Sequence, residues 1–205
     1  MADRTTGRSA PRTETELHGD DWYGDDVSGQ EHTRVAFIDV DLTETTGRGS
    51  VFTECTFSNC RFNAAAYAEC AFVNCTFTGC NFFDASFTGC KLVGSAFNRC
   101  SFDLLKVERG DWSFAHLPGA DLRRARFTGT RMREVDLSRA NCAGSALLGV
   151  DLAAALLTGA DLTECDLRGS IIDALDPLSV TLRGAIVDVQ QALIIAQALG
   201  LDVRS

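Results

Sequence analysis

The chain has 205 residues, with 28 acidic and 19 basic side chains and a formal net charge of −9. That balance argues against direct binding to nucleic acid, which requires basic side chains to neutralise phosphates, and is compatible with either a basic partner or ordinary solubility. No apolar run reaches the roughly 18 residues of a membrane-spanning helix, and residues 1–34 lack the layout of a signal peptide. We therefore expect a cytoplasmic, single-domain protein that does not bind membranes.

The N-terminal region is predicted to contain a tail and an imperfect first coil. Residues 1–16 are rich in Thr, Arg and acidic side chains and hold few apolar ones, so we predict that they are disordered. Residues 17–34 show the first signs of a five-residue period, at Leu17, Trp22, Val27 and His32. We interpret 17–34 as an imperfect coil that covers the open end of the repeats that follow.

From Phe37 to Ile172 the five-residue register continues without a slip. Every fifth residue from Phe52 to Ile172 is apolar, 25 positions in succession. We call these positions the centres. The residue two positions before each centre, the small position, is nearly always Ala, Cys or Ser, and the other three positions are mostly polar, charged or Gly. A repeat of this regularity has to be interpreted before any single motif.

A spacing of five fits neither the 3.6-residue period of a helix nor the two-residue period of a strand. One large and one small inward residue per five suits a short straight segment followed by a corner, and four such segments close a square coil of 20 residues. Stacked coils would rise about 4.8 Å each, the spacing of neighbouring strands. Residues 17–187 are therefore predicted to form one solenoid, filled inside and stabilised by contacts between adjacent coils.

A few residues break the pattern. Gly47 stands where a large centre is expected, and Leu105 and Gly110 occupy small positions. We expect an irregular coil near residues 103–116. Asp176-Pro177 interrupts the repeat once more before it returns to phase.

The nine cysteines are interpreted as core side chains. Eight occupy small positions and Cys142 occupies a centre, at spacings unlike the two-residue gaps of zinc sites. A free Cys behaves as a small buried hydrophobe, and cysteines 20 apart, such as Cys55 and Cys75, should stack between neighbouring coils. No metal site is predicted, and a reducing cytosol disfavours disulfides.

No catalytic residue and no cofactor are predicted. The histidines, His18, His32 and His116, lie in no motif with a carboxylate and a nucleophile, and the chain has no Gly-x4-Gly-Lys-Ser/Thr phosphate loop. A filled solenoid also offers no cleft for a small ligand. We therefore expect a protein that is not an enzyme and acts through its outer surface.

Residues 188–205 are predicted to form a helix and a short tail. Asp188 and Gln191 make a capping-box pair, and Gly200 suits the residue after a helix. The helix is apolar nearly all round, so more than one of its sides must be buried. One side can cover the last coil and another can meet a twofold copy, with a monomer as the alternative. The predicted dimer interface consists of Val189, Ala192, Leu193, Ile195, Ala196 and Leu199.

Acidic residues are concentrated towards the two ends of the chain, whereas six arginines lie within residues 123–139. The C-terminal half is the better candidate for binding a basic partner. Its Asp residues could instead serve the backbone, because Asp and Asn side chains hydrogen-bond main-chain groups in turns. The acidic candidates for partner binding are Asp121, Asp136, Asp151, Asp161, Glu164 and Asp166.

The succession of Ala or Cys, Asp or Asn, and Leu or Phe resembles the pentapeptide repeat family. Instances are Ala120-Asp121-Leu122, Ala160-Asp161-Leu162 and Cys165-Asp166-Leu167. The resemblance covers roughly residues 17–187. It implies an all-β solenoid, specifically a right-handed quadrilateral β-helix with a C-terminal α-helix.

A narrower resemblance concerns the segments 48–52, 92–97 and 183–189, which are similar to the fluoroquinolone-resistance proteins of the MfpA and Qnr branch. The chain differs from the MfpA pattern by a longer N-terminus and about one extra coil. This resemblance implies a homodimer joined through the C-terminal helices. It also implies a DNA mimic that binds DNA gyrase, a type II topoisomerase, and modulates it or protects it from quinolone-like or natural-product poisons. The alternative is a structural or adaptor module that binds another protein.

Overall fold

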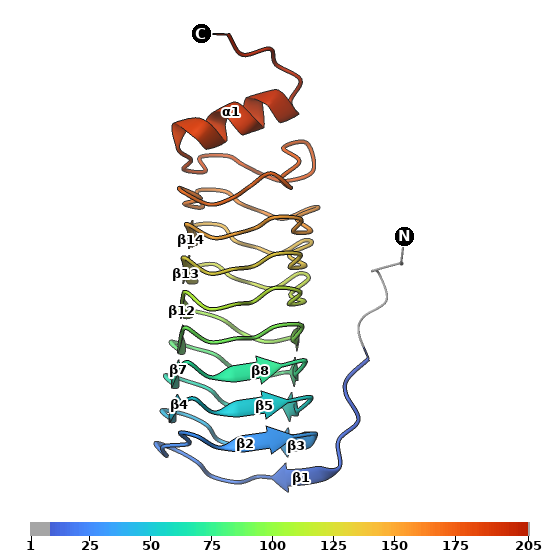
Figure 1. The fold of residues 1–205 in the computed structure, drawn as a ribbon, viewed down its shortest axis with the longest axis vertical. Helices are drawn as coiled ribbons and strands as arrows, with labels where there is room; N and C mark the ends of the chain where they lie inside the picture. The colour runs from blue at the N-terminus through green and yellow to red at the C-terminus, as the bar shows by residue number, and fades with distance from the viewer. Residues whose placement is uncertain (1–8, 205) are drawn as a thin grey trace.

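The computed structural model describes residues 9–204, which form a rod of stacked coils closed at one end by a single helix (Figure 1). The helix, α1 (Val189–Ala198), covers the last coil, and the first coil lies at the opposite end of the rod. This arrangement confirms the predicted fold class, an all-β solenoid with a C-terminal α-helix.

Three parallel sheets run along the rod, and each occupies one side of the coils. The first side carries β1 (Thr15–His18), β3 (Val35–Ile38), β6 (Thr56–Ser58), β9 (Thr76–Thr78) and β11 (Ala96–Asn98). The third side carries β4 (Thr46–Arg48), β7 (Ala66–Ala68), β10 (Ser86–Thr88), β12 (Lys106–Glu108), β13 (Arg126–Thr128) and β14 (Ala146–Leu148). The fourth side carries β2 (Glu31–Thr33), β5 (Val51–Thr53) and β8 (Ala71–Val73). Within the described residues, the second side is held by isolated bridges alone, such as Asn141 with Asp161.

Neighbouring coils pair residues that are 20 positions apart. In β6 and β9, for example, Phe57 lies opposite Phe77. Main-chain groups are satisfied between coils, as where the N–H of Leu42 donates to the carbonyl of Arg61 at 2.7 Å. The predicted square coil of four five-residue segments is therefore present.

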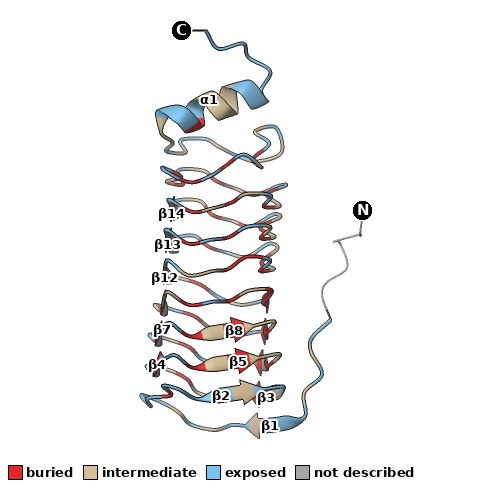
Figure 2. Cartoon of the chain, in the orientation of Figure 1, coloured by how far each residue is buried: buried red, intermediate tan, exposed pale blue. Residues whose placement is uncertain are grey.

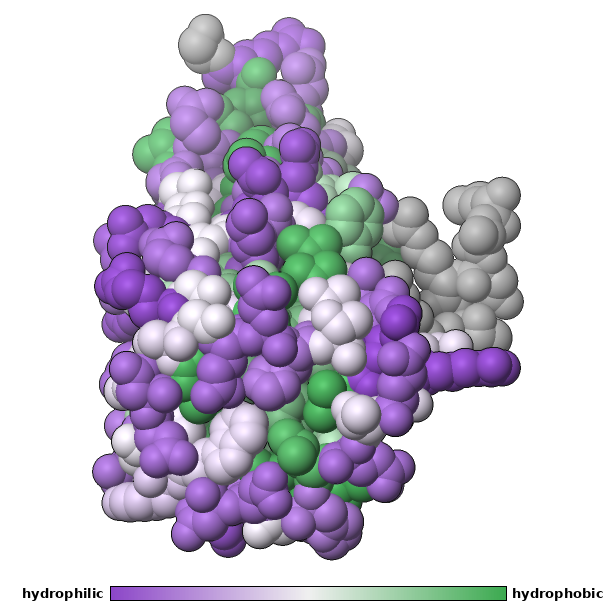
Figure 3. Space-filling view, turned by 60° about the horizontal axis from the view of Figure 1, so that its bottom comes forward, coloured by the Kyte–Doolittle hydropathy of each residue, from purple (hydrophilic) through white to green (hydrophobic). Residues whose placement is uncertain are grey.

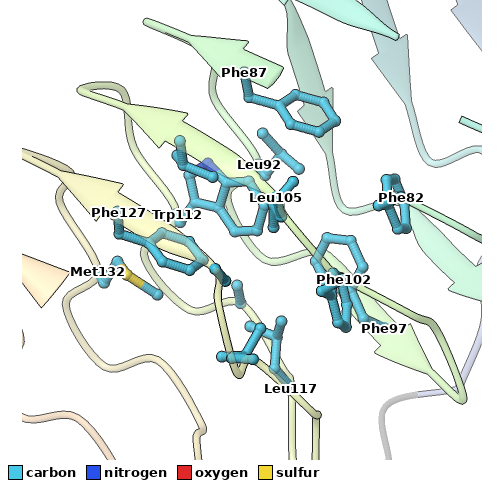
Figure 4. Close-up of a cluster of buried hydrophobic side chains, with 14 of the residues drawn as sticks. Phe82, Phe87, Leu92, Phe97, Phe102, Leu105, Trp112, Leu117, Phe127 and Met132 are labelled. Atoms are coloured by element: carbon cyan, nitrogen blue, oxygen red, sulfur yellow. The ribbon is translucent and has the colours of Figure 1, made fainter. Parts of the chain in front are cut away.

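The centres and small positions fill the interior of the rod (Figure 2). In the N-terminal half, Phe rings lie flat on one another: the ring centroids of Phe57 and Phe77 are 4.8 Å apart, with 9° between their planes. This distance matches the spacing of adjacent strands, so one ring fits each coil and gains stacking in addition to burial. Around Trp112 the core changes from Phe rings to aliphatic side chains such as Leu117 and Met132 (Figure 4).

Each segment turns its corner at the residue two positions after its centre. That residue has a left-handed backbone at every corner from Gly19 to Gly169, for example φ +54° at Asn59 and +66° at Gly79. Left-handed conformation bends the chain sharply after a short extended stretch, and it is unfavourable for side chains other than Gly, Asn and Asp. Many corners nevertheless carry other residues, so packing between coils must compensate for this cost.

The glycine at centre 47 is explained by the coil above it. A Cβ on Gly47 would lie 2.8 Å from Cδ1 of Tyr67 and 3.1 Å from Cγ2 of Val27. The ring of Tyr67 occupies this space, and its hydroxyl lies 2.9 Å from Oγ1 of Thr45. Burial raises the pKa of Tyr67, so the phenol stays protonated and is able to make this bond.

The irregularity expected over residues 103–116 is limited to one corner. The register continues through this region, since Lys106 pairs with both Ser86 and Arg126. Only Gly110 departs from the regular corner geometry, in which one residue is left-handed. It follows Arg109 as a second consecutive left-handed residue, with φ +79°. A Cβ at Gly110 would collide with the main chain of Cys90, so glycine is required where the two coils approach closely.

The predicted interruption at Asp176-Pro177 forms a local loop. The N–H of Gly159 donates to the carbonyl of Ser179, 20 residues ahead, instead of the usual 19. The bridge between Asp161 and Thr181 then restores the register, so the loop does not disturb the final coil.

The first coil begins two residues before its predicted boundary. Thr15 and Glu16, which were assigned to the tail, belong to β1 because they pair with Val35 and Ala36. The rest of 17–34 forms the predicted coil, in register with the next one. Residues 1–8 of the predicted disordered tail lie outside the described residues.

Candidate partner-binding surface

The filled interior leaves the outer surface as the part of the molecule that can bind a partner. Figure 3, with the N-terminal end turned forward, shows mostly hydrophilic side chains with hydrophobic ones scattered among them. The part of the chain that the structure describes contains no group of three or more side chains able to hold a metal ion. None of its helices is long and apolar enough to span a bilayer.

The five candidate aspartates share one structural role. In each, Oδ1 accepts a hydrogen bond from the main-chain N–H two residues later, as predicted for turn residues. The donors are Arg123 to Asp121, Ser138 to Asp136, Ala153 to Asp151, Thr163 to Asp161, and Arg168 to Asp166, at 2.9 to 3.2 Å. Asn81 and Asn141 accept the same bond without a charge. The turn therefore needs the oxygen atom and not the negative charge.

Four of the aspartates also have a basic partner within 4.0 Å. These pairs are Asp121 with Arg123 (2.6 Å), Asp136 with His116 (3.0 Å), Asp151 with Arg133 (3.4 Å) and Asp166 with Arg168 (2.7 Å). The arginine partners hold the pKa values of Asp121 and Asp166 below the usual range. Because the three arginines partly neutralise Asp121, Asp151 and Asp166, these carboxylates present a weaker negative field than their number suggests.

Asp161 and Glu164 differ from the other candidates. Neither has an ion pair within 4.0 Å among residues 9–204, and the side chain of Glu164 is exposed. Hydrogen bonds from the side chain and main chain of Thr163 hold the pKa of Asp161 below its usual value. The positive charge of Arg183 makes a smaller contribution to the lowered pKa of Asp161, so this carboxylate lacks an ion pair but still has a basic residue nearby.

The candidates do not form one continuous stripe. The bridges place Asp121, Asn141 and Asp161 in one column on the second side, where Glu164 also lies. Asp136, Asp166 and Asp151 fall on the first, third and fourth sides respectively. The second side near α1 is consequently the part of the C-terminal half where the candidate acids gather.

The helix begins with the predicted capping box. The side chain of Asp188 accepts from the N–H of Gln191, and the side chain of Gln191 accepts from the N–H of Asp188, both at 2.9 Å. Gln191 is also the residue that sequence reasoning missed, because a polar side chain was not expected against the coil. Its Nε2 donates to the carbonyls of Leu167 (2.6 Å) and Ser170 (2.8 Å), and only 2% of the residue is exposed.

Two opposite faces of α1 are apolar. Ile194 and Ile195 are partly buried and pack against the core of the last coil, so Ile195, predicted at the dimer interface, also contributes to covering the rod. The other predicted interface residues lie towards the free side. Of these, Val189 and Leu199 are 74% and 47% exposed, and Ala192 is also exposed, whereas Leu193 and Ala196 are half-buried. Their spacing of three or four residues makes one continuous apolar stripe.

His116 acquires a partner that sequence alone did not assign. Its Nδ1 lies 3.0 Å from Oδ2 of Asp136, one coil further along the first side. The 20-residue separation of the two residues was the available signal. The structure thus places His116 beside a carboxylate of the adjacent coil, and the two form an ion pair only when the histidine is protonated.

The cysteines act as donors within the core. Cys75 Sγ, for instance, donates to the carbonyl of Phe52 at 3.3 Å, as Ser95 Oγ does to Phe72 at 2.7 Å. All nine are free thiols. Interaction with the Cys75 thiol lowers the pKa of Cys55 to about 7, whereas burial raises that of Cys165 to about 11.

Comparison with family models identifies this architecture by sequence. Residues 30–106 match a model described as a pentapeptide repeat region, and residues 111–141 and 136–172 match a model of pentapeptide repeats. The chain therefore belongs to the pentapeptide repeat family. No curated protein matches the chain by sequence.

Solved structures show a related fold. A trypsin-treated variant of QnrB1, a plasmid-mediated fluoroquinolone resistance protein, is 22% identical, covers 94% of this chain and 99% of its own, and superposes with a TM-score of 0.62. Full-length QnrB1 is 20% identical, with 93% and 99% coverage and a TM-score of 0.55. At this level of identity the likeness concerns the fold.

Proposed function

We propose that the protein is a DNA mimic that binds DNA gyrase in the cytoplasm and modulates it or protects it from quinolone-like or natural-product poisons. The supporting observation is a rod of QnrB1-like fold with a net charge of −9 and with Asp161 and Glu164, which make no ion pair within the described residues, on one side. An acidic rod complements a basic groove that normally holds a duplex, and such complementarity gives orientation and a high association rate without base contacts.

The acidic contact surface in this proposal is the second side near α1. Asp161 and Glu164 would face the basic partner directly, whereas Asp166 would contribute less because Arg168 pairs with it. Asp121 and Asp151 would be similarly weakened by Arg123 and Arg133. Asp136 would contribute less because it lies on the first side.

The proposal includes a homodimer. The apolar stripe of Val189, Ala192, Leu193, Ala196 and Leu199 lies on the free side of α1 at the end of the rod. Pairing of two such stripes around a twofold axis would remove this apolar surface from water. It would also join two rods end to end into a body roughly 80 Å long, from about eight coils per rod at strand spacing. The acidic regions of the two copies would then lie next to the junction.

An adaptor role for a different protein partner is favoured by one observation. The coil that contains Arg123, Arg131 and Arg133 carries both signs of charge, and ion pairs neutralise much of it. A surface that carries both signs of charge complements a partner protein whose own surface is mixed in charge better than it complements a basic surface that normally binds DNA.

Supercoiling by purified gyrase, with and without ciprofloxacin, separates the two functions. The mimic is expected to inhibit supercoiling or to reduce drug-induced cleavage complexes, in proportion to its concentration and less at high salt. The control is the double substitution Asp161→Asn, Glu164→Gln, which removes charge and keeps side-chain shape. Absence of inhibition and of protection by the unaltered protein would exclude gyrase and support the adaptor role.

A further inference from the structure

Three columns of stacked thiols run through the N-terminal half of the core, and the proposed function uses none of them. Each column joins small positions 20 residues apart in neighbouring coils. The columns are Cys55–Cys75, Cys70–Cys90 and Cys60–Cys80–Cys100. In the longest column the thiol of Cys80 interacts with those of both Cys60 and Cys100.

The column of Cys60, Cys80 and Cys100 reaches the surface at one end. Cys60 and Cys80 are each 1% exposed, but Cys100 is only partly buried, unlike the other described cysteines. Cys100 also lines a surface depression together with Arg123 and Arg124. A small solute can therefore meet Cys100 from outside and find Cys80 directly next to it in the adjacent coil.

The spacing between coils at this level is compatible with an ion that bridges the two thiols. The ring pairs that flank Cys80 and Cys100 are separated by 4.8 Å (Phe77 to Phe97) and 5.5 Å (Phe82 to Phe102). Two metal–thiolate bonds of about 2.3 Å in line would span roughly 4.6 Å, close to the coil spacing.

We propose that Cys80 and Cys100 form a two-coordinate site for a soft monovalent d¹⁰ cation, Cu(I) or Ag(I). Each thiol gives up its proton to solvent and binds through sulfur, and the metal keeps its oxidation state. Thiolates favour soft ions such as Cu(I), whereas Zn²⁺ takes four ligands, and residues 9–204 offer no group of three. Arg123 and Arg124 line the same depression, and each already pairs with a carboxylate there, Asp121 and Asp103 respectively.

The chain itself indicates which substitution tests the site without disturbing the fold. Ser95 occupies the same slot as the cysteines, and its hydroxyl donates to the carbonyl 23 residues earlier. Cys80 and Cys100 make the equivalent bonds to Phe57 (3.4 Å) and Phe77 (3.6 Å). Serine should therefore keep this hydrogen bond while removing the soft ligand.

The test adds Ag(I) to the reduced full-length protein. Native mass spectrometry counts the bound ions, silver–thiolate absorbance follows binding, and X-ray absorption gives the number of sulfur neighbours. We expect one rapidly bound ion with two sulfur neighbours, lost in both Cys80→Ser and Cys100→Ser. Cys75→Ser is the matched control and should retain the ion, because the Cys55–Cys75 column is buried at both ends.

Several results would overturn this site: no rapid binding by the unaltered protein, retention of the ion by Cys100→Ser, or three or more sulfur neighbours. Equal loss in Cys75→Ser would also contradict it. Thermal unfolding without metal identifies a variant that fails to fold. For variants that do fold, the rise in melting temperature on adding Ag(I) is a second readout, and it should occur only in proteins that contain both thiols.

Discussion

Tyr67 and Gly47 are coupled across one coil spacing: the tyrosine ring fills the space that a side chain at residue 47 would need. The Gly47→Ala substitution should therefore destabilise the protein by about 1–3 kcal/mol, the usual cost of overpacking a filled core. Urea unfolding measures the change. The double variant Gly47→Ala, Tyr67→Leu provides the control, because removal of the ring should recover part of the loss. Additive effects of the two substitutions would show that the contact carries no energy.

Gln191 fastens the helix to the last coil. The substitution Gln191→Leu removes the donor to two carbonyls, Leu167 and Ser170, and should cost about 1–3 kcal/mol for each one left unpaired. The neighbouring Gln190→Leu, at an exposed position, should have little effect in the same thermal unfolding experiment. Equal stability of the two variants would argue against a fastening role.

The free apolar stripe of α1 predicts the oligomeric state. The double substitution Leu193→Glu, Ala196→Glu should halve the mass measured by light scattering, because paired charges would be buried at a twofold contact. Gln190→Glu, Gln197→Glu adds the same charge at exposed polar positions of the same helix and should leave the mass unchanged. A monomeric unaltered protein would refute the dimer.

Charge and turn geometry can be separated at Asp161. Asp161→Asn should keep stability within about 0.5 kcal/mol, since Asn141 makes the same turn in the adjacent coil. Its affinity for gyrase, measured by surface plasmon resonance, should nevertheless fall. Asp121→Asn, in the same column, is the matched control and is expected to lose less affinity because Arg123 already pairs with that carboxylate. An equal loss in both variants would mean that compensation by neighbours does not matter.

Stability should decline in acid through the helix cap. Hydrogen bonds from the main chains of Gln191 and Gly169 lower the pKa of Asp188 from its ordinary value of 3.8. A carboxylate with a lowered pKa in the folded state stabilises the protein above pH 3.8, and this contribution disappears as the pH falls through the lower value. Melting temperatures recorded from pH 6 to about pH 2.5 should decrease less for Asp188→Asn than for the unaltered protein. Parallel curves would contradict this role.

The fold was predictable because one arithmetic rule governs nearly every buried position. The period of five identified the centres, and the interval of 20 identified which residues stack, including the pair of Phe57 and Phe77. The capping box at Asp188 was predictable for a similar reason, since it depends on local spacing.

The details that escaped prediction depend on side-chain direction. The sequence pattern could not show that Gln191 turns towards the coil, or that Ile195 packs against the core. The sequence also could not show that Asp151 pairs with Arg133 while Asp161 has no ion pair among the described residues. These outcomes depend on the direction in which each arginine side chain extends between coils. For Gly47, the explanation lies in Tyr67, a residue one coil away.

The 20-residue pairing interval has a consequence for how such a rod can change its length. Inserting a whole coil would move the distal end outward by about one strand spacing and leave every side facing as before. Inserting a single five-residue unit would instead swing all distal sides by a quarter turn, carrying Asp161 and Glu164 away from whatever they face. Adding complete coils therefore changes the length of the rod without changing the direction in which each side faces.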